Sequence, residues 1–97
     1  YFKNKNVVIT GASGGVGQCL ANNFASSGAS LILTDLNEEK LIELKKTIIN
    51  KYQVKVITYT IDVSNQTDVQ EFADSILEKF NKIDILINNA GIGYSGE

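Results

Sequence analysis

Residues 7–17 read Val-Val-Ile-Thr-Gly-Ala-Ser-Gly-Gly-Val-Gly, an apolar run followed at once by a glycine-rich segment. The first three residues are β-branched without polar alternation, which is typical of a strand buried on both faces of a parallel sheet. The glycines let the chain turn sharply. We expect a helix to follow, and its apolar face comprises Val16, Cys19, Leu20 and Phe24. Such a strand, turn and helix N-terminus present N–H groups and a positive dipole that suit a phosphate or pyrophosphate.

The rest of the chain repeats this alternation of strand and helix. Further strands are predicted at residues 30–34, 54–61 and 83–87. The intervening helices are predicted to begin at the N-caps Asn37 and Ser64. The order βαβαβαβ predicts an α/β fold with a doubly wound parallel sheet. In that fold the first two helices cover one face of the sheet and the third helix covers the other.

The composition fits one small globular domain. The chain has 97 residues, 43% hydrophobic content and a formal net charge of -2, which gives no general attraction to nucleic acid or anionic lipid. Its apolar runs are far shorter than the roughly 20 residues that cross a bilayer, so no membrane segment is predicted. The single cysteine, Cys19, cannot form an internal disulfide, so we expect a cytoplasmic protein with Cys19 as a buried small hydrophobe. No metal site is predicted.

The unusual residues of the chain all follow predicted strands. They are the glycine segment, Asp35, the pair Asp62-Val63, and residues 88–91. Because ligands of doubly wound sheets collect at the carboxyl ends of the strands, we expect these residues to surround one binding site.

Several proteins carry glycine-rich segments of this kind. A nucleoside triphosphate P-loop needs a lysine after its last glycine, and no lysine occurs between Asn6 and Glu38. Residues 11–15 fit the Gly-x-Ser-x-Gly elbow of an α/β-hydrolase, but the chain has no histidine to act as base. A dinucleotide site expects an acidic residue about 20 positions further on, and Asp35 stands there. An adenosylmethionine-dependent methyltransferase also uses a glycine loop and such an acid, so it remains an alternative.

Two motifs resemble the signatures of the short-chain dehydrogenases/reductases. Thr10-Gly11-x-x-x-Gly15-x-Gly17 is similar to the cofactor loop of that family, and Asn88-Asn89-Ala90-Gly91 is similar to its second signature. The resemblance covers nearly the whole chain and implies a Rossmann domain that binds NAD. The cofactor-binding residues that it implies are Gly11, Ser13, Gly14, Gly15, Val16, Gly17, Asp35, Leu36, Asp62, Val63, Asn89, Ala90 and Gly91.

The resemblance also implies a role for each group of residues. The glycines approach the pyrophosphate, Asp62 contacts the adenine amino group, Val63 flanks the adenine, and residues 88–91 brace the sheet and touch the nearer ribose. A carboxylate at Asp35 accepts hydrogen bonds from the adenosine ribose, whereas NADP would place a phosphate beside it and beside Leu36. We therefore expect NAD as the cofactor. A side chain at Gly15 or Gly17 is expected to weaken cofactor binding more than folding.

The chemistry of this family is hydride transfer between nicotinamide and a small-molecule alcohol or carbonyl substrate. Its catalytic serine, tyrosine and lysine lie beyond the second signature, so no catalytic residue is predicted in this chain. The 97 residues are interpreted as the N-terminal, cofactor-binding half of one domain, inactive alone. Such a piece exposes a sheet edge and an apolar face, so a homo-oligomer is expected. The alternative is a dinucleotide-sensing relative without catalysis.

Overall fold

A computed structural model describes residues 3–80 and 82–89 of the chain. Its elements alternate as the sequence predicts, with small differences at the ends of the strands. In chain order they are β1 (Asn6–Thr10), α1 (Gly15–Ser26), β2 (Ser30–Asp35), α2 (Glu38–Tyr52), β3 (Val56–Thr60), α3 (Gln66–Lys79) and β4 (Ile85–Asn88).

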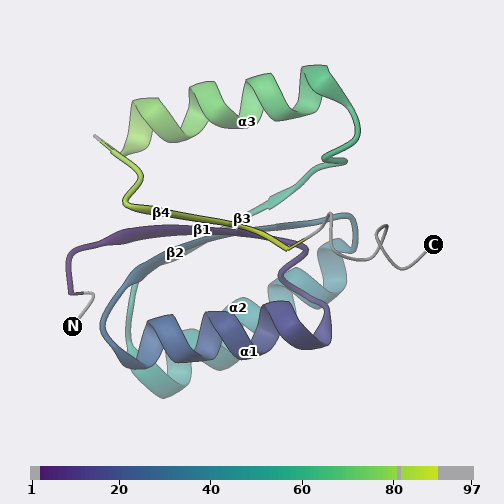
Figure 1. Ribbon diagram of the computed structural model, residues 1–97. Helices are drawn as coiled ribbons and strands as arrows, with labels where there is room; N and C mark the ends of the chain where they lie inside the picture. Colours follow the sequence, from purple (N-terminus) through teal and green to yellow (C-terminus); the bar gives the residue numbers. More distant parts are fainter. Residues whose placement is uncertain (1–2, 81, 90–97) are drawn as a thin grey trace.

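The four strands form one parallel sheet in the order β3-β2-β1-β4. The chain winds outward from β1 through β2 to β3, and then crosses back to place β4 on the other side of β1. Helices α1 and α2 lie on one face of the sheet and α3 lies on the opposite face (Figure 1). The predicted doubly wound fold is therefore confirmed.

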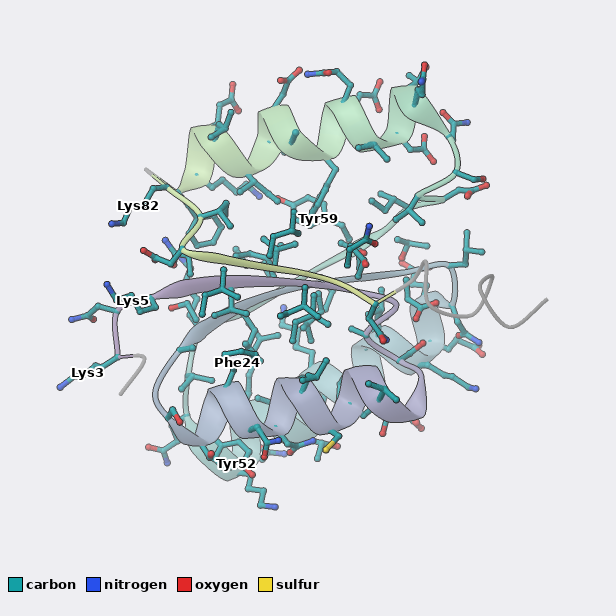
Figure 2. All side chains as sticks on the ribbon, viewed as in Figure 1. Lys3, Lys5, Phe24, Tyr52, Tyr59 and Lys82 are labelled. Atoms are coloured by element: carbon teal, nitrogen blue, oxygen red, sulfur yellow. The ribbon has the colours of Figure 1, made fainter. Side chains whose placement is uncertain are left out.

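The face covered by α1 and α2 holds the larger core. Helix α1 turns its small residues Gly17, Ala21 and Ala25 toward the sheet, so its backbone lies close to the strands. Leu20 and Phe24 are partly buried beside them, and Phe24 lies between α1 and the sheet (Figure 2).

The predicted apolar face of α1 is wrong at two positions. Cys19 is exposed, and Val16 is 59% exposed. At about 100° per residue, Val16 lies about 100° and Cys19 about 200° around the helix from the buried Gly17. The small residues occupy the buried stripe because they allow the closest approach, and the larger side chains are displaced from it.

The second helix begins as predicted. The Asn37 side chain accepts a hydrogen bond from the N–H of Lys40 at 3.0 Å, which caps α2. Leu41, Leu44 and Ile48 form its buried stripe.

The predicted N-cap of the third helix is wrong. Asn65 caps α3, because its side-chain oxygen accepts hydrogen bonds from the N–H groups of Thr67 and Asp68 at 2.9 and 3.1 Å. Ser64 lies one residue before the cap position, and its hydroxyl and its N–H both donate to Asp62.

The face covered by α3 is less completely packed. Among the apolar residues of α3 and its C-cap, Ile76 and Phe80 are buried, but Val69 and Leu77 are 39% and 63% exposed. Tyr59 lies on this side of the sheet (Figure 2), with its ring edge-on to Phe72 at 5.0 Å between centroids. An apolar groove of about 420 Å³ remains between the sheet and α3.

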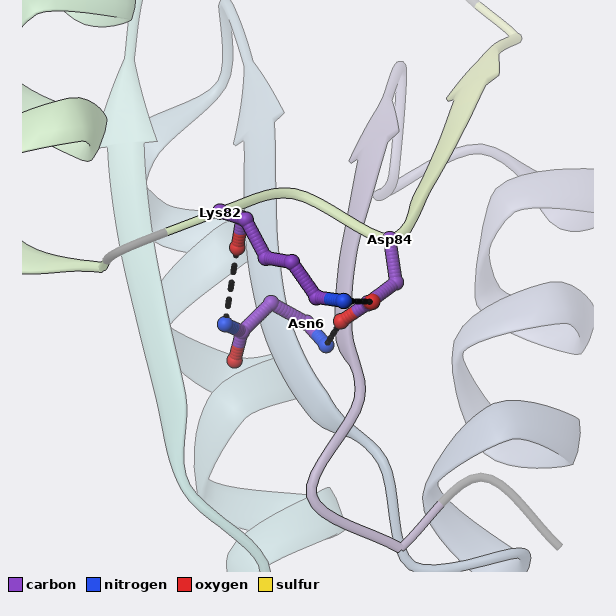
Figure 3. A network of polar contacts seen from close by, with 3 residues as sticks. All are labelled: Asn6, Lys82 and Asp84. Carbon is purple, nitrogen blue, oxygen red and sulfur yellow. Dashed lines mark hydrogen bonds and ion pairs between the residues drawn. The ribbon is translucent and has the colours of Figure 1, made fainter.

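The amino ends of β1 and β4 are joined by a network of polar contacts (Figure 3). The N–H of Asn6 donates to the carboxylate of Asp84 at 2.8 Å, and the N–H of Asp84 donates to the Asn6 carbonyl at 2.9 Å. The Asn6 side-chain amide donates to the Lys82 carbonyl at 2.9 Å, and the Lys82 ammonium lies 3.3 Å from Asp84. These contacts fix the register of β4 against β1.

Candidate functional site

The glycine turn between β1 and α1 is held by both of its neighbours. Gly11 has a φ of 64°, which residues other than glycine rarely adopt. Its carbonyl accepts a hydrogen bond from the N–H of Gly14 at 3.3 Å. The N–H of Ala12 donates to the Thr34 carbonyl of β2 at 3.0 Å. From inside α1, the Gln18 side chain donates to the Ser13 carbonyl at 2.7 Å. Gln18 was missed in the sequence, where only its place one turn into the helix hints at this contact.

The N-terminus of α1 differs from those of the other two helices. Its N-cap is Gly14, which makes no side-chain capping bond, and the first turn of α1 carries no acidic residue. Helices α2 and α3 each have an asparagine cap and an acidic first turn. Within residues 3–80, α1 alone therefore leaves the first-turn N–H groups and the dipole uncompensated by side chains.

Two glycines with the same predicted role, Gly15 and Gly17, have different surroundings in the structure. A Cβ at Gly15 would meet nothing within 4 Å, whereas a Cβ at Gly17 would lie 2.4 Å from the Gly11 carbonyl oxygen and 2.7 Å from Ala12 Cα. The expectation that a side chain at Gly17 affects binding more than folding is therefore wrong, because helix and turn meet there. For Gly15 the expectation stays open.

Asp35 lies at the end of β2 beside the glycine turn. Its Oδ2 accepts from the hydroxyl and the N–H of Ser13 at 2.6 and 3.0 Å, although the two residues are 22 positions apart. Its Oδ1 accepts from the N–H groups of Leu36 and Asn37 at 2.7 and 3.4 Å. Burial alone would raise the pKa of Asp35, but the hydrogen bonds from Ser13, Leu36 and Asn37 outweigh it and hold the pKa below its ordinary value. The Asp35 side chain is therefore a held carboxylate, meaning one that is fixed in place by hydrogen bonds, and it stays charged near neutral pH.

The end of β4 braces the same turn. The Asn89 side chain donates to the Gly11 carbonyl at 3.0 Å, and the Thr10 hydroxyl donates to the Asn88 side-chain oxygen at 3.1 Å. This confirms the bracing expected of the Asn-Asn-Ala-Gly segment at its first two residues. Ala90 and Gly91 lie outside the described residues.

The segment after β3 completes this edge of the sheet. Asp62 Oδ1 accepts from the hydroxyl and the N–H of Ser64 at 2.6 and 2.9 Å, and these bonds lower its pKa. Val63 lines the groove between the sheet and α3 together with Thr10 and Asn88. Those predicted residues that the structure describes thus lie at the carboxyl ends of the strands. The closest contacts join the glycine turn, Asp35 and Asn89.

Two kinds of feature are not found among the described residues. No described helix is long and apolar enough to cross a membrane. Residues 3–80 and 82–89 also contain no group of three His, Cys, Asp or Glu side chains that could hold a metal ion.

Sequence comparison gives matches to one family. The profile of the family described as short chain dehydrogenase matches residues 5–97. The chain is 46% identical over 86 residues to the short-chain dehydrogenase/reductase family 16C member 6 of Bos taurus, covering 89% of this chain and 27% of that protein. It is 40% identical over 88 residues to 3beta-hydroxysteroid dehydrogenase 2 of Eggerthella lenta, covering 91% of this chain and 34% of that protein.

Solved structures show the same likeness. L-sorbose reductase from Gluconobacter frateurii, solved with NADPH and L-sorbose, aligns with a TM-score of 0.87 and 35% identity over 92% of this chain and 34% of that one. An NAD+-bound xylitol dehydrogenase aligns with a TM-score of 0.83 and 32% identity over 88% of this chain and 32% of that one. The chain thus spans about a third of the length of these proteins. Neither a hydrolase nor a methyltransferase is favoured by the comparisons.

Proposed function

The chain belongs to the short-chain dehydrogenase family, and from this premise we propose that it forms the NAD-binding part of an oxidoreductase acting on an alcohol or carbonyl compound. The observation that carries the proposal is the pairing of an uncapped helix N-terminus with a held carboxylate across one glycine turn. Hydride chemistry is supplied by the dinucleotide when it is bound, and the described residues bind and orient it.

The glycine turn fits a pyrophosphate. The first-turn N–H groups of α1 lack intrahelical partners, and the helix dipole favours an anion beside them. The open space at the Cβ position of Gly15 supports close approach of a ligand to the backbone there. Gly14 and Val16 flank this position, and Val16 exposes its side chain on the same turn.

The choice of NAD over NADP rests on Asp35. Its carboxylate accepts hydrogen bonds and carries a negative charge, which suits the hydroxyls of a ribose and repels a 2′-phosphate. Leu36, which follows it, is 68% exposed and offers no positive charge to a phosphate. The related structures named above carry either NADPH or NAD+, so the preference rests on Asp35 and Leu36 alone. We expect NAD to bind at least about 100-fold more tightly than NADP, or roughly 3 kcal/mol.

The remaining parts of the cofactor are assigned to the neighbouring strand ends. We assign the adenine to Asp62 and Val63, because these residues lie next to Asp35. The N–H of Ile61, directly before Asp62, donates to the Asp35 carbonyl at 3.1 Å. The nearer ribose is assigned to Asn89, Ala90 and Gly91, of which only Asn89 belongs to the described residues.

Titration of the intact protein with NAD and NADP by calorimetry tests the proposal. Replacement of Asp35 by alanine should reduce the preference for NAD to less than about 10-fold. The ribose of NAD then loses its hydrogen-bond acceptor, and the 2′-phosphate of NADP is no longer repelled by a carboxylate. Asp74→Ala is the matched control. It removes the same charge from an exposed position on α3, where Asp74 accepts only from the Gln70 side chain among the contacts described, and it should leave the preference unchanged. Equal affinities of the wild type for both cofactors would refute the assignment of NAD.

We also propose a cytoplasmic homo-oligomer. A single cysteine that lies exposed on α1 is consistent with a reducing compartment. Leu77 and Leu86 are 63% and 64% exposed on the α3 side, and apolar side chains there favour association. Light scattering at micromolar concentration checks the size, and a monomer would contradict the oligomer.

A further inference from the structure

The carboxylate of Asp35 already holds as many hydrogen bonds as its oxygens accept readily. Each carboxylate oxygen offers about two lone-pair positions. Oδ2 accepts the hydroxyl and the N–H of Ser13, and Oδ1 accepts the N–H groups of Leu36 and Asn37. A ribose that donates a hydroxyl to Asp35 must therefore displace one of these four donors.

The four donors differ in their freedom to leave. Three are backbone N–H groups, which are fixed by β2, by the glycine turn and by the entry to α2. The fourth is the Ser13 hydroxyl, which can rotate about its own side-chain bonds without moving the chain. Its bond to Asp35 is also the shortest of the set at 2.6 Å, so it occupies Oδ2 well while no ligand is bound.

We propose that the Ser13 hydroxyl is an exchangeable donor that occupies Asp35 in the free protein and yields its place to the 2′-hydroxyl of the adenosine ribose. This inference rests on the proposed function, because the exchange requires a ribose at Asp35. Ser13 is then a positioning residue that acts through Asp35. The bond to Oδ2 keeps the carboxylate turned toward the glycine turn until the ligand arrives.

The exchange also separates NAD from NADP. A free 2′-hydroxyl has a proton to donate and can replace the serine, so Asp35 keeps its number of donors. A phosphorylated 2′-oxygen has no such proton and adds negative charge. The serine therefore competes with the ribose of NAD, whereas the 2′-phosphate of NADP offers no donor to take its place.

Removal of the hydroxyl has a distinctive consequence. In Ser13→Ala, water replaces the serine at Oδ2, and the ribose displaces this weaker competitor. NAD should then bind about 3- to 10-fold more tightly, while NADP affinity stays within about 2-fold. Ser13→Thr keeps the hydroxyl and should bind NAD less tightly than Ser13→Ala. If the Ser13 hydroxyl made only a structural contact, its loss would weaken the binding of NAD and of NADP alike.

Calorimetric titration of the wild type and these variants with NAD and with NADP tests the inference. A double-mutant cycle adds the decisive comparison, because the gain from Ser13→Ala should vanish in the Asp35→Ala background. Unchanged or weaker NAD binding by folded Ser13→Ala, or a gain that persists without Asp35, overturns the exchange while the proposed function stands. No NAD binding by the wild type overturns both.

Folding of the variants is checked by thermal unfolding. If Ser13→Ala does not fold, Ser13→Cys decides, because a thiol is a weaker donor than a hydroxyl. It should bind NAD more tightly than the wild type, and equal or weaker binding overturns the inference.

Discussion

The two ends of the sheet use similar groups for different purposes. At the amino end, Asp84 accepts from the N–H of Asn6 and pairs with the Lys82 ammonium (Figure 3). At the carboxyl end, Asp35 accepts from Ser13, Leu36 and Asn37, and among the described residues no ion pair involves it. One carboxylate is neutralised within the network that fixes the strands. The other keeps its charge beside a helix N-terminus and can select a ligand.

The largest effect is expected at the base of the glycine turn. Gly17→Ala would place a Cβ 2.4 Å from the Gly11 carbonyl oxygen, so α1 must move away from the turn. We expect the free energy of unfolding to fall by about 3 kcal/mol or more, measured by urea denaturation. Such a loss of stability would show that the glycine turn at the carboxyl end of the sheet also contributes to folding.

Gly15→Ala is the matched control for this prediction. The added methyl meets nothing within 4 Å, and the residue begins a helix. Stability should change by less than about 1 kcal/mol, in the stabilising direction, while NAD affinity falls. If both substitutions destabilised the protein equally, the distinction between the two glycines would be wrong.

A smaller effect is expected at the amino end. Asp84→Ala removes the acceptor for the Asn6 N–H and the partner of Lys82. The melting temperature should fall by a few degrees, because the register of β4 against β1 loses support. NAD affinity in the folded variant should not change, since the glycine turn lies at the opposite end of β1. A loss of affinity as large as that of Asp35→Ala would mean that the ends are not independent.

The smallest effect is the dependence of stability on pH. The hydrogen bond from Asn6 lowers the pKa of Asp84 most, with the Lys82 contact adding to it, and the pKa of Asp35 is also lowered. A carboxyl group whose folded pKa is depressed stabilises the protein above its unfolded pKa of about 3.9, and this stability is lost as pH falls through the folded pKa. Urea denaturation should therefore show weaker folding below about pH 4. Asp84→Asn should show a shallower loss than Glu78→Gln, which removes the same charge from an exposed position on α3.

Much of the fold could be predicted because its signals are local. The unbroken apolar run of residues 7–9 indicates a central strand, and Asn37 before two glutamates indicates a helix start. Asp35 could be predicted at its strand end from its spacing to the glycine turn.

The errors arise where tertiary contacts decide. Periodicity marks Cys19 as apolar, but the sheet accepts the small residues of α1 instead. Ser64 and Asn65 are both good N-cap residues by type, but α3 begins at Gln66, so the cap position falls on Asn65. The hydrogen bond between Ser13 and Asp35 joins residues 22 positions apart, and no local sequence pattern predicts it.

The most direct test of the account is to map NAD binding onto the two ends of the sheet by amide chemical shifts. We predict the largest changes on titration with NAD at residues 14–16 and at Leu36, and changes within experimental error at Asn6 and Asp84. Shifts of equal size at both ends, or shifts confined to the Asn6 and Asp84 network, would contradict the assignment of the dinucleotide site to the carboxyl ends of the strands.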